Sequence, residues 1–241
     1  VGITDHGNMH GAYELWRAAV DSGVKPIIGI EAYVTPETAR QDKTRVSWDT
    51  NWTPVPGHAR NPDDVSGGGL ITHLTMWAEN DEGLVNLIKA SSVANLEGRV
   101  MRYPRMDKEV LSTYSKGVIA SSGCPSGIIQ TRLRLGQFDE ALRAAGEFQD
   151  IFGKDNFYIE LMDHGLSIES KVTGDLLTIA KKLGAPLLAT NDSHYVMEAD
   201  KDAQDAMLCI NSGATLDDPN RFKFEGSGYY IKSAEEMREL F

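Results

Sequence analysis

Asp192 and His194 stand one residue apart at the end of an apolar run, in the segment APLLATNDSHY. The run Pro186–Ala189 is typical of a short buried strand bounded by a proline. Asn, Asp and Ser often end a strand and cap the helix that follows, so this ending alone has an ordinary structural explanation. A carboxylate next to an imidazole can also bind a metal or carry a proton. That second interpretation gains weight only if other strands end in the same way.

Apolar runs alternate with helix-like segments along the whole chain. We predict six strands, over Val1–Asp5, Pro26–Val34, Leu70–Ala78, Gly117–Ser121, Phe157–Met162 and Pro186–Thr190. Between them the 3.6-residue periodicity of amphipathic helices is clear over residues 138–152 and 168–183. Strands that are apolar throughout, separated by helices, favour a parallel α/β sheet covered by helices. Either an open doubly wound sheet or a closed barrel fits this pattern.

Potential metal ligands lie at or near the carboxyl ends of these predicted strands. They are His6, Glu31, His73, Cys124, Asp192 and His194. The carboxyl ends of parallel strands meet on one face, so these side chains are expected to share one cleft. Each alone has a structural explanation, such as a hydrogen-bonded core histidine or a small apolar cysteine. Together they predict a cluster of the kind that binds zinc, manganese or iron.

Composition limits the classes of function. The 241 residues carry a net charge of −11, which is not typical of a protein that wraps nucleic acid, although a nuclease needs only a local basic path. Three arginines are candidates for such a path, or else for solvated faces: Arg102, Arg105 and Arg132. No apolar run reaches the ~18 residues of a membrane helix. The two cysteines favour a reducing compartment, and residues 36–69 form a long polar loop.

Six segments together resemble a known family. They are GITDHGNMHGAYEL, KPIIGIEAYV, THLTMWAENDEGLVNLIKASS, SSGCPSGIIQTRLRLGQ, ELMDHG and ATNDSHY. The chain resembles the PHP domain (polymerase and histidinol phosphatase) of bacterial C-family DNA polymerases, in the style of actinobacterial polymerase III alpha subunits. The resemblance covers residues 1–241 and implies a distorted (β/α)7 barrel. The family's opening strand, with its His-x-His pair, would precede Val1, so we expect a fragment that lacks the first strand–helix unit.

The resemblance also implies a function. It implies a metal-dependent 3′–5′ proofreading exonuclease, acting at primer 3′ ends within a cytoplasmic DNA-directed DNA polymerase. The six residues above correspond to the family's ligands for up to three divalent ions, zinc or manganese, or iron. Glu31, Asp192 and His194 are the expected catalytic residues. The implied partners are DNA, the polymerase core of the same chain, the sliding clamp and other replisome subunits.

Two alternatives stay open at this stage. The first is a non-catalytic PHP scaffold that supports the polymerase and its partners, although a scaffold does not need the six retained ligands. The second is a free-standing PHP phosphoesterase that acts on small phosphate esters. The segments QTRLRLG and DPNRFKF resemble the polymerase form and count against it. The missing first unit would impair nuclease activity in this fragment.

Overall fold

The structure is a computed structural model that describes residues 1–55, 60–226 and 228–241. The chain folds into two compact units. The first comprises residues 1–160 and 175–188, and the second comprises residues 161–174 and 189–241.

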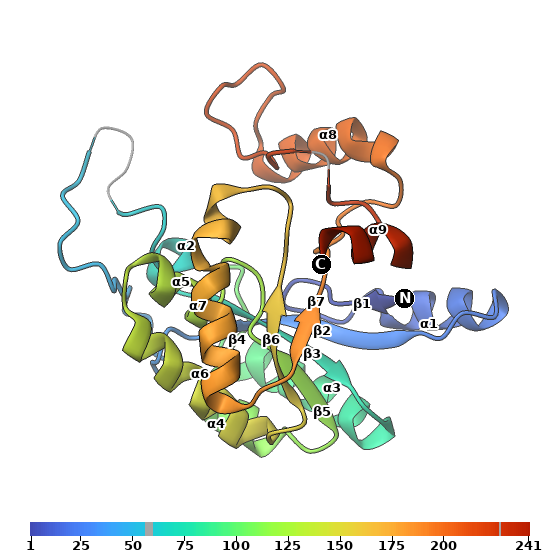
Figure 1. Cartoon of the computed structure of the whole chain (residues 1–241), viewed down its shortest axis with the longest axis horizontal. Coiled ribbons are helices and arrows are strands. Elements are labelled where there is room, and N and C mark those ends of the chain that lie inside the picture. Colours follow the sequence, from blue (N-terminus) through green and yellow to red (C-terminus); the bar gives the residue numbers. More distant parts are fainter. Residues whose placement is uncertain (56–59, 227) are drawn as a thin grey trace. The chain divides into compact units, whose positions relative to one another are not determined.

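The sheet contains seven strands in the described part of the chain (Figure 1). The strands are β1 (Gly2–Ile3), β2 (Ile27–Val34), β3 (Thr72–Ala78), β4 (Arg105–Met106), β5 (Val118–Ser121), β6 (Phe157–Leu161) and β7 (Leu187–Ala189). Their order is β1-β2-β3-β5-β6-β7, and β4 pairs with β2 outside this path. All six predicted strands are present, and each is one to three residues shorter than its apolar run. The two-residue strand β4 was not predicted.

The prediction of a wholly parallel sheet is wrong. β1 and β4 run parallel to β2, and β5 runs parallel to β6. β3 is antiparallel to both of its neighbours, β2 and β5. A continuous apolar run reports that a strand is buried on both faces and does not report its direction. The long segment between β2 and β3 allows the chain to return in the opposite sense.

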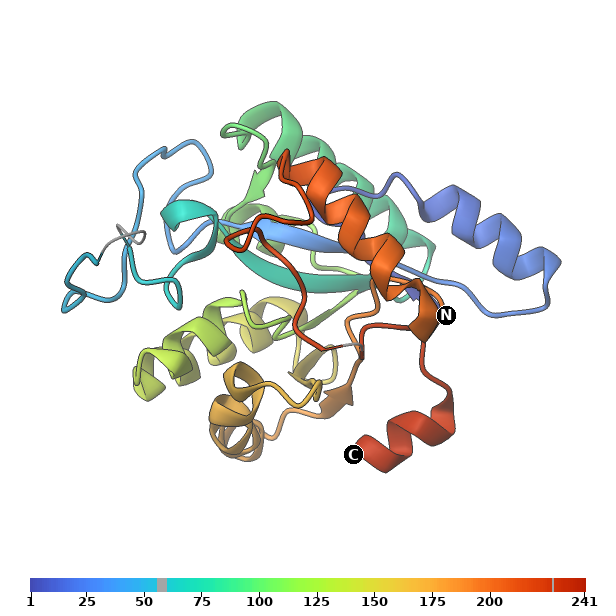
Figure 2. The same ribbon diagram turned by 90° about the horizontal axis from the view of Figure 1, so that it is seen from above.

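Helices surround the sheet of the first unit (Figures 1 and 2). In chain order they are α1 (Ala12–Asp21), α2 (Ser66–Gly69), α3 (Asp81–Glu97), α4 (Lys108–Thr113), α5 (Ile128–Arg134) and α6 (Phe138–Phe152). α7 (Ser167–Leu183) begins in the second unit and ends in the first, and the second unit also holds η1 (Glu198–Asp200), α8 (Lys201–Ser212) and α9 (Ala234–Leu240). The helix predicted over residues 138–152 is confirmed as α6, and that over 168–183 as α7. The fold is a mixed α/β fold whose curled sheet is a partial (β/α) barrel.

α3 is held firmly against the sheet, and this matters because it borders the site described below. The Asn80 side chain caps the helix by accepting a hydrogen bond of 3.0 Å from the Gly83 N–H. Gly83 allows close backbone approach, since a Cβ there would lie 1.6 Å from the Gly117 carbonyl oxygen. Leu87, Ala90 and Ala94 are buried along the inner face of the helix.

The predicted loop over residues 36–69 contains only the short helix α2 among its described residues, and residues 56–59, including His58, lie outside them. The buried Asp64 carboxylate organises part of this loop by accepting hydrogen bonds from the N–H groups of Trp48 and Asp49. No helix in the described part of the chain is long and apolar enough to cross a membrane.

Candidate metal centre

Glu31 is the centre of the candidate site. It stands in the middle of β2, where its neighbours in the sequence IIGIEAYV are apolar, and only 5% of its surface is exposed. A carboxylate buried in a strand needs compensating partners. Burial raises the pKa of Glu31, but hydrogen bonds from His6 and His73 outweigh burial and hold that pKa well below its ordinary value. The Glu31 side chain is therefore an anion at neutral pH.

The backbone places His6 beside Glu31. His6 follows β1 and forms an isolated parallel bridge to Glu31. The Glu31 N–H donates to the Asp5 carbonyl (3.0 Å), and the Gly7 N–H donates to the Glu31 carbonyl (2.8 Å). Gly7 has a φ of +67°, and a Cβ there would lie 2.6 Å from the Tyr33 ring, so only glycine fits this turn. As a result the His6 Nδ1 contacts Oε2 of Glu31.

His73 and Cys124 lie on the other side of Glu31. The His73 Nδ1 is 3.2 Å from Oε1 of Glu31 and 3.2 Å from the Cys124 sulfur. Cys124 is buried in the turn after β5, as predicted. One ligand atom each from His6, Glu31 and His73 lies within 4.8 Å of the others, so these three residues can hold a metal ion. Cys124 extends this set of donors by its contact with His73.

Asp5, the residue before His6, supports the site in two ways. In the structure Oδ2 of Asp5 accepts a hydrogen bond of 2.9 Å from the Gly11 N–H, at the turn that leads into α1. Asp5 therefore positions His6 through its backbone carbonyl, which binds Glu31, and its side chain fixes the following turn.

The other two predicted ligands, Asp192 and His194, belong to the second unit. Asp192 has a φ of +42°, a left-handed conformation that few residues other than glycine adopt. This turn brings its carbonyl oxygen to 2.7 Å from the His194 Nδ1. The His194 N–H donates to the Tyr229 carbonyl (2.8 Å), and its ring lies 4.5 Å from the Phe224 ring. The first unit thus brings together four of the six predicted ligands, and the second unit holds the remaining two.

The second unit also contains a buried ion pair that was not predicted from the sequence. The His164 Nδ1 lies 2.6 Å from Oε1 of Glu169, and its Nε2 lies 3.0 Å from the Asn191 carbonyl oxygen. Both partners are acceptors, so both ring nitrogens carry protons. Burial lowers the pKa of His164, but the hydrogen bond to Glu169 outweighs it and raises that pKa. His164 is a structural cation here, and only its spacing of five residues from Glu169 hinted at the pair.

The three arginines predicted to bind nucleic acid differ in their surroundings. Arg105 is fully buried and donates to four backbone carbonyls, those of Gly98, Leu70, Arg40 and Asp42. Its assignment as a nucleic-acid contact is therefore corrected, because its guanidinium has no surface for a phosphate. Arg132 donates to Glu37 (2.5 Å) and lies 3.7 Å from the Trp48 ring centre, so its charge is already engaged. Arg102 is exposed.

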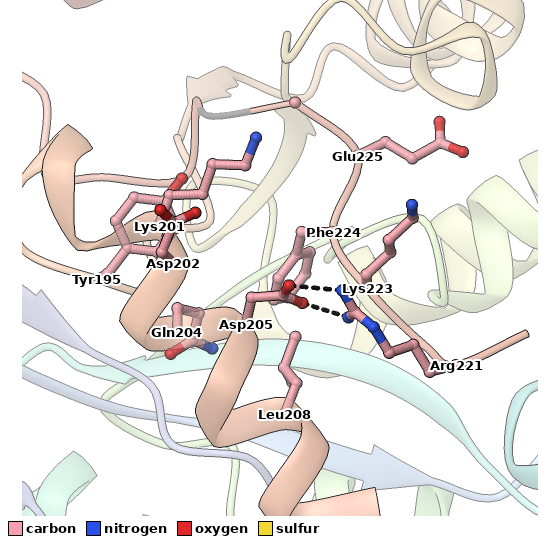
Figure 3. A pocket seen from close by; sticks show the side chains of 11 residues that line it. Tyr195, Lys201, Asp202, Gln204, Asp205, Leu208, Arg221, Lys223, Phe224 and Glu225 are labelled. Carbon is pink, nitrogen blue, oxygen red and sulfur yellow. Dashed lines mark hydrogen bonds and ion pairs between the residues drawn. The ribbon is translucent and has the colours of Figure 1, made fainter. Parts of the chain in front are cut away.

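Arg102 lines a groove that also contains His6. The cavity measures about 520 Å³ and is bordered by the turn after β1, by Tyr33 and by the outer face of α3. The second unit has a cavity of about 470 Å³ at the start of α8 (Figure 3). There the guanidinium of Arg221 forms a two-pronged ion pair with the Asp205 carboxylate.

Similarity to known proteins identifies the family. A sequence profile of the PHP domain matches residues 1–164, more than half of the chain. The chain belongs to the PHP domain family. The matched region contains the four clustered donors of the first unit, so the predicted family and the observed donor group agree. Asp192 and His194 lie beyond the matched residues.

Curated relatives of this PHP domain are much longer proteins. The chain is 52% identical over 241 residues to DNA polymerase III subunit alpha of Mycobacterium leprae and 54% identical to that of Saccharopolyspora erythraea, both actinobacteria. It is 40% identical to DNA polymerase III subunit alpha of Borreliella burgdorferi. All of the chain is covered in each case, but only 19–20% of the relative. The chain spans about a fifth of the length of the relatives it matches.

Proposed function

We propose that this PHP domain is a metal-dependent 3′–5′ exonuclease, which removes mispaired nucleotides from primer 3′ ends within a DNA polymerase III alpha subunit. The observation that carries the proposal is the group of His6, Glu31 and His73, whose ligand atoms converge in the first unit. The similarity to DNA polymerase III subunit alpha supports the choice of DNA as substrate. In this proposal the domain comprises residues 1–241, works in the cytoplasm, and contacts the polymerase core, sliding clamp and other replisome subunits.

The donor set fits a divalent transition metal. Two imidazoles and a carboxylate suit zinc, manganese and iron, and the Cys124 sulfur beside His73 favours zinc or iron over magnesium. When bound, such an ion lowers the pKa of a bound water and stabilises negative charge on a phosphoryl oxygen. The complete domain is proposed to hold up to three ions, with Asp192 and His194 as further ligands.

The protein's own residues contribute charge and orientation. Glu31 supplies a fixed anion, because its pKa is held below the ordinary value, and it contacts one imidazole through each carboxylate oxygen. These contacts fix the positions of His6 and His73 before any substrate arrives. In the proposed mechanism Glu31, Asp192 and His194 are the catalytic residues. Arg102 supplies positive charge in the groove beside His6.

The test is release of nucleotides from a 3′-mismatched primer by the complete DNA polymerase III alpha subunit that is proposed to contain this domain, with manganese or zinc supplied. We expect release by the wild type and loss of release in Asp192→Asn and in Glu31→Gln. Glu79→Gln is a matched control, because Glu79 is an exposed carboxylate directly after β3. Metal content measured on the same samples shows whether a variant has lost its ions.

The outcomes separate the three candidate functions. Equal, negligible release by wild type and variants, with metal retained, would favour the non-catalytic scaffold. Hydrolysis of histidinol phosphate without release from DNA would favour a phosphoesterase that acts on small esters. Loss of release in Asp192→Asn while polymerisation continues would support the proofreading exonuclease.

A further inference from the structure

The groove beside His6 has an unusual charge for this protein. Its lining contains Arg99, Arg102 and His10 but no aspartate or glutamate. The chain as a whole carries a net charge of −11, so a groove free of acidic residues stands out from its surroundings. The cavity of the second unit provides a contrast, since its lining has three basic and three acidic residues: Lys201, Arg221 and Lys223, and Asp202, Asp205 and Glu225. Of these two cavities, the groove beside His6 has the charge pattern of an anion-binding surface.

The positive charges of the groove are available. Arg99 and Arg102 are both exposed, and neither forms an ion pair with a carboxylate among the described residues. The nearest acidic residue in the sequence, Glu97, is occupied by Arg40, whose guanidinium nitrogen lies 2.8 Å from a Glu97 carboxylate oxygen. The Arg102 guanidinium lies 5.3 Å from the centre of the Tyr103 ring, which supports the side chain without neutralising its charge.

The α3 side of the groove carries polar residues. Ser91 and Asn95 lie four residues apart on α3, and Arg99 follows two residues after the helix ends. The Asn95 amide nitrogen donates to the Ser91 carbonyl oxygen (3.0 Å), so the amide oxygen of this exposed residue is left as an acceptor. Hydroxyl, amide and guanidinium groups are among those that proteins use to hold a sugar–phosphate backbone.

The groove is continuous with the metal centre through His6. His6 is one of the residues that line it, and its Nδ1 contacts Glu31. The Tyr33 ring also lines the groove and stacks almost parallel to the His6 ring, with an interplanar angle of 8°. A strand lying in the groove would therefore reach the metal centre with its end.

We infer that this groove binds the backbone of single-stranded DNA, with Arg99 and Arg102 contacting the phosphates nearest the terminal phosphodiester. This inference rests on the proposed function. It also explains why the domain would prefer a polynucleotide to a small phosphate ester. In this inference the arginines contact the nucleotides next to the one that is removed, whereas a small phosphate diester reaches the metal centre without touching either arginine. Arg105 and Arg132 have no part in this surface.

The test compares the hydrolysis of two substrates by the complete DNA polymerase III alpha subunit. One is a thymidine oligonucleotide, cleaved at its 3′ end, and the other is bis(4-nitrophenyl) phosphate. In the double variant Arg99→Gln, Arg102→Gln we expect kcat/KM for the oligonucleotide to fall at least about tenfold. We also expect the slope of log(kcat/KM) against log[salt] to become shallower by about 1.4, since each phosphate contact to a single strand contributes about 0.7. Hydrolysis of the small diester should be unchanged, which also shows that the variant is folded.

Lys89→Gln is the matched control, because Lys89 is an exposed cation on α3 that does not line the groove. This variant should hydrolyse both substrates with the same kcat/KM as the wild type. An equal fall for both substrates in the double variant would mean that the arginines support the metal centre, and no change for either would mean that the strand lies elsewhere. Either result would overturn the inference.

A second readout separates failure of the groove from failure of the proposed function. Modification of arginines by phenylglyoxal is followed by mass spectrometry, with and without the same oligonucleotide. We expect Arg99 to be protected and Arg17, an exposed arginine on α1, to be modified equally in both samples. If the wild type hydrolyses neither substrate, the proposed nuclease activity is contradicted. Protection of Arg99 would then still support binding of DNA in the groove. Equal modification of Arg99 with and without the oligonucleotide would contradict the inference that the groove binds DNA.

Discussion

The His73 Nδ1 lies 3.2 Å from Oε1 of Glu31, although the two residues stand on antiparallel strands. In the register of β2 and β3, Glu31 is opposite Thr75 and Tyr33 is opposite His73. Glu31 and His73 are thus diagonal neighbours on one face of the sheet, within reach of each other's side chains. The two donors are fixed by strand pairing rather than by loops, so the metal centre is preorganised by the sheet.

Glu31→Gln is expected to abolish most metal binding. The amide keeps the volume of the side chain but removes the anion that both imidazoles contact, so nucleotide release should fall at least about 100-fold. In the wild type, a chelator should lower the melting temperature, since an ion present at 100 times its Kd stabilises the fold by about 2.7 kcal/mol. The Glu31→Gln melting temperature should not respond to the chelator. Thermal unfolding with and without chelator checks this, and an equal response in both proteins would contradict the role of Glu31.

Cys124→Ser is expected to change which metal is bound. Replacing sulfur by oxygen removes the soft donor beside His73, so zinc affinity should fall about tenfold or more while manganese affinity changes less. Substitution with cobalt gives a direct readout, because a bound thiolate produces a charge-transfer absorption that serine cannot produce. If the wild type shows no such band, Cys124 is not a ligand and acts only on His73. Cys209→Ser is the control, as Cys209 is a buried cysteine of α8 in the second unit.

The sequence predicted the presence of strands better than their direction. The apolar runs located all six predicted strands, because burial on both faces leaves a clear trace in composition. The reversal of β3 left no such trace, since it depends on how residues 35–71 return to the sheet. The argument that every ligand lies at a strand's carboxyl end therefore fails for His73, the second residue of β3. Antiparallel pairing nevertheless brings the amino end of β3 to the edge where β2 ends.

The ligands of the first unit were predictable because charged or polar residues interrupt apolar strands. Glu31 and His73 are conspicuous for this reason, and both lie in the cluster. Arg105 shows the limit of the same reasoning. It lies in the basic segment EGRVMRYPRMDK, which on composition alone fits an exposed surface. Four backbone carbonyls that converge from distant parts of the chain bury it instead, and long-range carbonyls cannot be read from a sequence.

Arg105→Lys is expected to destabilise the first unit by about 3 kcal/mol or more. Lysine has three donors on one nitrogen and cannot span the four carbonyls that the planar guanidinium reaches, so buried acceptors would be left unpaired. Arg102→Lys, an exposed change five residues beyond the end of α3, should cost less than about 0.5 kcal/mol. Urea unfolding of the two variants checks the difference. Unchanged stability in Arg105→Lys together with weaker binding to single-stranded DNA would restore Arg105 as a nucleic-acid contact.

The His164–Glu169 pair is expected to make stability depend on pH in two directions. Burial lowers the pKa of His164, but the hydrogen bond to Glu169 raises it above its ordinary value of 6.5. The contribution of His164 is therefore fully present below pH 6.5 and is lost as the pH rises through the raised pKa. Burial raises the pKa of Glu169, but the hydrogen bond from His164 lowers it below its ordinary value of 4.5. The contribution of Glu169 is present above pH 4.5 and is lost as the pH falls through the lowered pKa.

Both contributions are complete only between pH 4.5 and 6.5, so the pair stabilises the second unit most in that window. Glu169→Gln removes the charge but keeps a hydrogen-bond acceptor for His164. We expect it to cost about 1.5–3 kcal/mol near pH 5.5, the range for a hydrogen bond to a charged group, and clearly less once His164 is neutral in the wild type. Urea unfolding near pH 5.5 and near pH 9 measures the two costs, with Glu198→Gln, an exposed carboxylate of η1, as the control. A cost that is the same at both pH values would contradict a change in the charge of His164 between them.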